Sequence, residues 1–239
     1  MQMLISFFTL IIVCLVCAQD KSESTESHAP IKPPEVSGIE INNTGDKGEL
    51  ELIGSFFYDR YTPGAEIEVE YAPARWLSLE AELPVYFKKP YFPQLELDAT
   101  FSILRKKEKG MFLSSGLEFS VPFTQEGEFE LEPWLGLKKT FAFLALLSKV
   151  SVEFGIENKE ELEYGVKAAF GPYFPIKNKM LIGSPLNYKN KEDQHTLLSG
   201  LECDFYFTDE ITVRFLGQYH VVSEEKGPYF SATFKAEFE

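Results

Sequence analysis

Carboxylates that alternate with apolar side chains are the feature of this sequence most able to do chemistry. Glutamates occupy alternate positions in two neighbouring stretches, residues 65–71 and 77–83. An extended strand repeats every two residues, so this alternation places the carboxylates on one face and the apolar side chains on the other. Closely spaced carboxylates need basic partners, bound cations or water to balance their charge. The chemistry predicted for this face is therefore the binding or passage of cations and small polar solutes.

The same acidic face recurs to the end of the chain, and we predict that it lines a hydrated interior. Carboxylates dominate this face, and a few lysines and arginines accompany them. The residues predicted to line the interior and to contact a solute or cation are Glu66, Glu68, Glu70, Glu80, Glu82, Glu96, Asp98, Glu130, Glu132, Glu163, Lys167, Glu202, Asp204 and Arg214.

The hairpin formed by residues 65–83 brings glutamate opposite glutamate in each of three neighbouring registers that keep its two faces. A five-residue turn sets Glu68 against Glu80. A slip of two residues in one direction sets Glu66 against Glu80, and a slip in the other sets Glu70 against Glu80. Such a wall either attracts cations and protons, or is solvated and balanced by distant lysines and arginines. Both interpretations stay open at this point.

A second hairpin has a register that its turn defines. A three-residue turn at Thr208–Glu210 places Asp204 opposite Arg214 and Tyr206 opposite Thr212. An opposite-charge pair on facing strands stabilises a sheet. We therefore predict that this pair has a structural role in the wall.

About twelve strands follow from the alternation, many of them longer than the roughly 5–6 residues of an average soluble strand. Twelve long strands with the apolar face inward would enclose more space than side chains fill, so we assign that face to lipid. The predicted fold is all-β, an antiparallel up-and-down transmembrane barrel, with a soluble exported β protein as the alternative. Phe87–Pro93 and Asn187–His195 are predicted as the longest connections. The predicted strands are Glu49–Tyr58, Gly64–Tyr71, Leu77–Tyr86, Gln94–Leu104, Met111–Val121, Gly127–Lys138, Phe143–Phe154, Glu161–Phe170, Ile176–Leu186, Thr196–Phe207, Ile211–Val222 and Tyr229–Phe238.

The residues before the barrel, which is predicted over 49–239, divide into two segments. Residues 1–18 contain an uncharged apolar run, too short for a transmembrane helix, that ends in small residues; we predict an export signal cleaved after Ala18. Lipid attachment at Cys17 or Cys14 is the alternative, although Val16 and Val13 precede them where a small residue is expected. Residues 19–48 are rich in serine, glutamate and proline, which predicts a disordered or extended arm.

Composition argues against several classes of function. The net charge of −14 argues against nucleic acid as a partner. Cys203 is alone in the mature chain, which excludes a disulfide framework. The mature histidines, His28, His195 and His220, adjoin no serine-hydrolase motif, so no catalytic residue and no cofactor are predicted. A metal site is left unassigned, and an enzyme that uses paired carboxylates stays as an alternative.

Two parts of the sequence resemble known bacterial proteins. A resemblance to the outer-membrane transporters of the phenol-degradation meta pathway rests on Glu49–Leu52, Tyr58–Tyr61, Glu68–Ala72, Trp76–Pro84, Lys138–Thr140 and the final strand. The last strand, Tyr229–Phe238, resembles the terminal strand of outer-membrane barrels, whose final aromatic residue is read by the assembly machinery.

These resemblances imply a place in the bacterial outer membrane and a role as a narrow channel or transporter. The partners that they imply are the lipid bilayer, the assembly machinery and a small-molecule or cation solute. The alternative is a non-conducting structural or surface-binding barrel.

Overall fold

A computed structural model of the chain describes residues 47–59, 62–87, 94–106, 109–123, 129–157, 161–176, 179–191, 194–208, 210–222 and 227–238. The predicted export signal, Cys17 and the predicted arm up to residue 46 lie outside the described residues. No helix in the described part of the chain is long and apolar enough to span a membrane.

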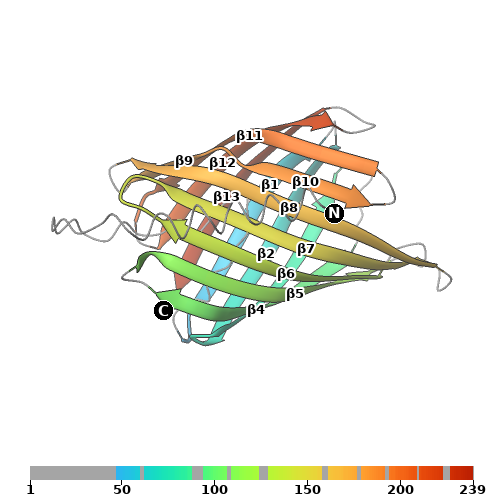
Figure 1. Cartoon of the computed structure of the whole chain (residues 1–239), viewed down its shortest axis with the longest axis horizontal. Coiled ribbons are helices and arrows are strands. Elements are labelled where there is room, and N and C mark those ends of the chain that lie inside the picture. Colours follow the sequence, from blue (N-terminus) through green and yellow to red (C-terminus); the bar gives the residue numbers. More distant parts are fainter. Residues whose placement is uncertain are drawn as a thin grey trace. The chain divides into compact units, whose positions relative to one another are not determined.

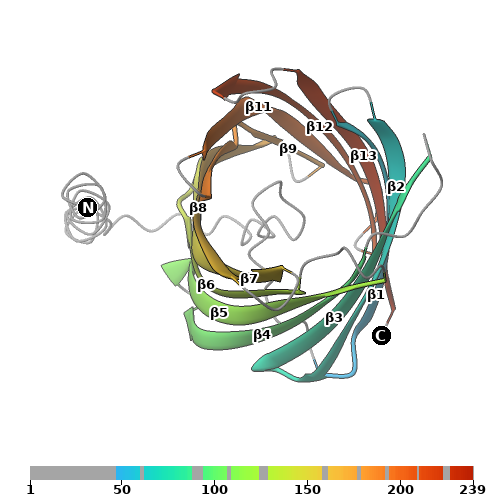
Figure 2. The ribbon, with the colours of Figure 1, turned by 90° about the vertical axis from the view of Figure 1, so that its right-hand side faces the viewer.

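The described strands pair antiparallel in chain order, and β13 closes on β1, so the sheet forms a barrel (Figures 1 and 2). Closure removes both edges, which satisfies the backbone hydrogen-bonding groups of every strand without water. This confirms the predicted antiparallel barrel. The strands are β1 (Leu50–Asp59), β2 (Thr62–Ala74), β3 (Leu77–Tyr86), β4 (Gln94–Lys106), β5 (Met111–Pro122), β6 (Phe129–Thr140), β7 (Ala145–Glu157), β8 (Glu161–Ile176), β9 (Met180–Gly183), β10 (Leu186–Lys191), β11 (Gln194–Tyr206), β12 (Ile211–Val222) and β13 (Pro228–Phe238).

Strands β9 and β10 occupy one position in the barrel. Both lie between β8 and β11, and their registers on β8 are continuous: Tyr173 faces Gly183, and Phe170 faces Leu186. Only Ser184 and Pro185 separate them, and proline has no N–H to donate to the ladder. The barrel therefore has twelve strand positions, as predicted, although thirteen segments fill them.

Two predicted boundaries in this region are wrong. Gly171–Pro175, predicted as a turn, continues β8, and the polar residues 187–191, predicted as part of the longest loop, form β10. Hydrogen bonds to β8 and β11 on both sides outweigh the weak strand preference of a segment rich in lysine and asparagine. The predicted ninth strand, Ile176–Leu186, is replaced by the pair β9 and β10.

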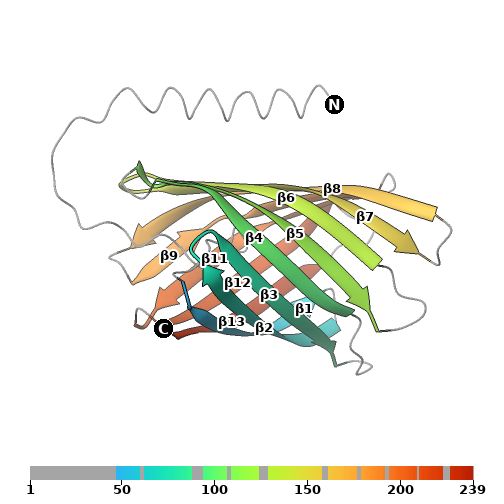
Figure 3. The same ribbon diagram turned by 90° about the horizontal axis from the view of Figure 1, so that it is seen from below.

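Figure 3 shows the ribbon of the barrel from below, and large apolar side chains are exposed on most of its strands, from Leu50 on β1 to Phe238 on β13. Phe56 is 68% exposed, Leu201 is 65% exposed and Ile67 is 62% exposed. Water would penalise so much exposed apolar area, whereas the hydrocarbon of a bilayer does not. Exposed aromatic residues at strand ends, such as Trp76, suit the interface between lipid and water.

The two ends of the barrel differ in their connections. We call the end where β1 begins and β13 ends the near end, and the opposite end the far end. The near-end connections are residues 75–76, 107–110, 141–144, 177–179 and 207–210. The two longest connections, 87–93 and 123–128, both join strand ends at the far end. Phe87–Pro93 was predicted as one of the longest connections, whereas 192–193, within the other predicted long connection, is short.

Closure of β13 on β1 predicts heat-modifiable migration on a gel. Detergent-extracted protein should run faster unheated than boiled, because a closed sheet resists unfolding by dodecyl sulfate. A chain truncated after Gly227, which lacks β13, should run only at the boiled position. Equal migration of heated and unheated full-length protein, or solubility without detergent, would contradict the membrane barrel.

Candidate functional site

The inward face of the barrel consists of the strand positions that alternate with the exposed apolar side chains. The structure places every residue that the sequence predicted for the interior on this face. On each strand these residues keep the step of two that the alternation requires, as Glu66, Glu68 and Glu70 do on β2. Contact of these side chains with a solute remains a prediction.

Seven of the carboxylates form one row across seven adjacent strands. Each member lies directly opposite the next in the register of neighbouring strands. The members of this acidic row, in spatial order from β13 through β1 to β6, are Glu237, Glu51, Glu70, Glu80, Asp98, Glu118 and Glu132.

The acidic row climbs along the barrel as it crosses the strands. It follows the hydrogen-bonding direction, and the strands of a barrel are tilted to its axis, so a row at right angles to them rises. Glu237 is the last residue but one of β13 and Glu51 is the second residue of β1, both at the near end. Glu132 is close to the far-end start of β6. The row therefore leads from one end of the barrel toward the other.

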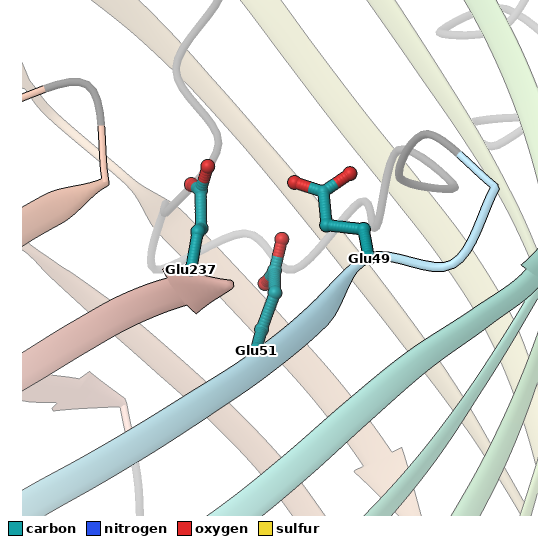
Figure 4. A group of neighbouring side chains, drawn as sticks. All are labelled: Glu49, Glu51 and Glu237. Carbon is teal, nitrogen blue, oxygen red and sulfur yellow. The ribbon is translucent and has the colours of Figure 1, made fainter. Parts of the chain in front are cut away.

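At the near end of the barrel, the acidic row starts in a group of three carboxylates. Glu49, Glu51 and Glu237 turn toward one another, and one oxygen of each lies within 4.8 Å of the others (Figure 4). The Nζ atom of Lys235 is 2.7 Å from Glu51 Oε2 and 3.4 Å from Glu237 Oε1. Lysine thus balances part of the charge where the row starts.

Three lysines surround the far end of the row. Lys167 contacts Glu132 and lies 2.7 Å from Glu153, a carboxylate that is fully buried. Lys189 Nζ is also 2.9 Å from Glu153 Oε2. Lys191 lies 3.2 Å from Glu163 Oε2, 3.5 Å from Glu153 Oε1 and 3.7 Å from Glu130 Oε1. Neither Lys189 nor Lys191 was predicted for the interior, because both lie in a segment predicted as a loop.

The middle of the row contacts hydroxyl and indole groups. Ser78 Oγ donates to Glu70, and Trp134 Nε1–H donates to Asp98 Oδ2 over 2.9 Å. The ammonium of Lys149 lies 4.8 Å from the centroid of the Trp134 ring. One pocket in the wall brings Asp98, Trp134 and Lys149 together, and its lining is Glu80, Glu82, Glu96, Leu97, Asp98, Glu118, Trp134 and Lys149.

The opening hairpin adopts one of the three predicted registers. Glu70 faces Glu80, and Glu68 faces Glu82, because an irregularity between Tyr71 and Ala74 shifts the pairing near the turn. One oxygen of each of Glu68, Glu70 and Glu80 lies within 4.8 Å of the others. Acidic groups of this kind are common without a bound ion, so we assign no metal here.

A buried ion group lies on β11 and β12. Asp204 faces Arg214, and Tyr206 faces Thr212, which confirms the predicted register. Arg214 Nε is 3.5 Å from Asp204 Oδ1 and 3.6 Å from Glu202 Oε1, and both carboxylates are fully buried. Arg214 therefore lies within ion-pair distance of two carboxylates at once.

An apolar cluster on the inward face adjoins this ion group. Ala145, Leu147, Tyr173 and Leu181 pack together, and each is at most 3% exposed. The Tyr173 hydroxyl donates to Glu202 Oε2 over 3.3 Å, which joins the cluster to the ion group. Strict alternation misses this cluster, since it expects polar side chains at these inward positions.

No family model and no curated protein matches this chain. Among solved structures, the COG4313 outer membrane channel from Pseudomonas putida F1 matches with a TM-score of 0.64 at 9% identity, over 82% of this chain and 97% of that chain. The KdgM porin matches with a TM-score of 0.61 at 10% identity, over 79% and 99%. The chain has the fold of outer-membrane channels. The NanC porin supports the same conclusion, with a TM-score of 0.60 at 10% identity over 80% and 99%.

Identities this low establish the fold alone. The fold and the apolar exterior agree with the predicted place in the outer membrane. Membership of the phenol-degradation transporter family stays a prediction.

Proposed function

We propose that the protein is an outer-membrane channel for small solutes and that its wall favours cations. The observation that carries this proposal is the acidic row, which leads from the near end toward the far end on facing positions of seven strands. Rows and rings of carboxylates lower the electrostatic cost of a cation in a pore and raise that of an anion.

The bilayer and the assembly machinery are the partners that this proposal requires. The exposed apolar exterior supports contact with lipid. Strand β13 supports recognition by the assembly machinery, because it completes the closure on β1 and carries Phe238 at its end.

A non-conducting barrel is the second candidate, and one observation favours it. The apolar cluster of Ala145, Leu147, Tyr173 and Leu181 fills part of the interior near the near end with tightly packed side chains. Such packing is typical of a barrel whose own side chains occupy its interior. In that case the barrel would serve as a structural or surface-binding element.

Planar-bilayer recording separates the two candidates. The purified full-length protein should produce steady single-channel currents in potassium chloride. Under a salt gradient, the reversal potential should have the sign of a cation-selective pore, and acidification should reduce that selectivity because it protonates carboxylates. Absence of current under all conditions would support the non-conducting barrel, and an anion-selective reversal potential would contradict the role of the acidic row.

A further inference from the structure

Inward-facing aromatic rings lie against glycines on the neighbouring strand. In three places a ring and a glycine face each other in register, and a Cβ atom added to the glycine would come within 2.2–2.3 Å of a ring atom. Only glycine leaves room for a ring in that position. The three pairs are Phe57 with Gly64, Trp134 with Gly116 and Tyr173 with Gly183.

Trp134 is the ring that adjoins the acidic row. It is 4% exposed, and its indole N–H donates to Asp98, a member of the row. Gly116, on β5, supports the ring through close approach to the Nε1, Cε2 and Cζ2 atoms. The ring therefore has a defined position on the wall, fixed by a hydrogen bond at its N–H and by the space above Gly116.

The face of this ring suits an ammonium group. The ammonium of Lys149 lies over it at 4.8 Å from the centroid, well within the range of a cation–π contact. The same pocket contains the carboxylates of Glu80, Glu96 and Glu118. An aromatic face beside carboxylates attracts organic ammonium ions more than it attracts small hydrated metal ions, because the organic cation loses less hydration energy on contact.

We propose that Trp134 is a specificity-determining residue that favours organic ammonium ions, and that Gly116 is its positioning residue. This proposal rests on the proposed channel function. A solute that carries an ammonium group would exchange with Lys149 on the indole face as it moves along the acidic row.

The test compares the permeabilities of tetramethylammonium and potassium by reversal potential. Trp134→Leu removes the aromatic face, and Gly116→Ala forces the ring off the wall; each should lower the ratio of tetramethylammonium to potassium permeability about two- to five-fold. Gly54→Ala is the matched control, because nothing lies within 4 Å of a Cβ atom there, and it should leave the ratio unchanged. Heat-modifiable migration confirms that each variant folds.

A second measurement separates this proposal from the channel function. Trp76→Phe leaves Trp134 as the remaining tryptophan, since the chain has two. In that background Gly116→Ala should increase acrylamide quenching of Trp134 fluorescence, and Gly54→Ala should not. A conducting wild type whose permeability ratio is unchanged by Trp134→Leu overturns the proposal about specificity. Unchanged quenching in Gly116→Ala overturns the positioning role, and a wild type that carries no current overturns the channel function and the specificity role together.

Discussion

Arg214→Ala is expected to lower the free energy of unfolding by about 3–5 kcal/mol, the usual cost of removing one partner from a buried ion pair. The guanidinium lies within 3.6 Å of two fully buried carboxylates, Glu202 and Asp204. Without it, two negative charges would remain next to each other out of contact with water. The measurement is the temperature at which the fast-migrating folded band converts to the unfolded position.

Two variants control this prediction. Arg214→Lys keeps a positive charge on β12 and should lose less stability than Arg214→Ala. Asp204→Asn in the Arg214→Ala background removes one of the stranded charges and should recover part of the loss. A conversion temperature of Arg214→Ala equal to that of the wild type, with equal assembly, would show that the pair has no structural role.

Neutralising the middle of the acidic row is expected to remove most of the preference for cations. The variant Glu80→Gln, Asp98→Asn and Glu118→Gln keeps side-chain size, and the asparagine oxygen can still accept from the Trp134 N–H. A carboxylate about 4 Å from a cation stabilises that cation by about 1 kcal/mol in a water-like dielectric. Each neutralised carboxylate should therefore reduce cation permeability relative to chloride by about five-fold. The measurement is the reversal potential in a potassium chloride gradient.

Neutral substitutions on the same wall provide the matched control. Ser114→Ala and Ser120→Ala change inward-facing, buried residues of β5 without changing the charge. They should leave the selectivity as it is in the wild type. If the triple variant conducts with unchanged selectivity, the middle of the acidic row does not set the preference for cations.

The alternation of polar and apolar residues predicted which side chains of most strands point inward and which point outward. This was possible because the two-residue period of a strand is a local property of the chain. Register was predictable where a turn was short, as at Thr208–Glu210, where Thr208 Oγ1 accepts from the backbone N–H groups of Glu210 and Ile211. Register of the opening hairpin was predictable only to three choices, since an irregularity near Tyr71 decides between them. Local sequence does not encode such irregularities clearly.

Non-local contacts explain the errors. Strand β10 is polar, and its partners on both sides hold it in the sheet. Lys189 and Lys191 form ion pairs with carboxylates on other strands. Tyr173 was assigned to a turn because Gly171 and two prolines surround it, yet it packs on Gly183. The signal for Trp134 was present in the alternation, because it continues the inward positions of Glu130 and Glu132 on β6.

The course of the acidic row makes the two halves of the wall electrically unequal. Strand β13 and strands β1 to β6 carry the row, whereas Lys149, Lys167, Lys189 and Lys191 project from β7, β8 and β10. This division produces an electric field across the barrel interior, which points from the lysine side to the carboxylate side. A dipolar solute would enter with its positive end toward β1–β5 and would turn about the barrel axis as it followed the rising row. The barrel would then orient its solute as well as select it by charge.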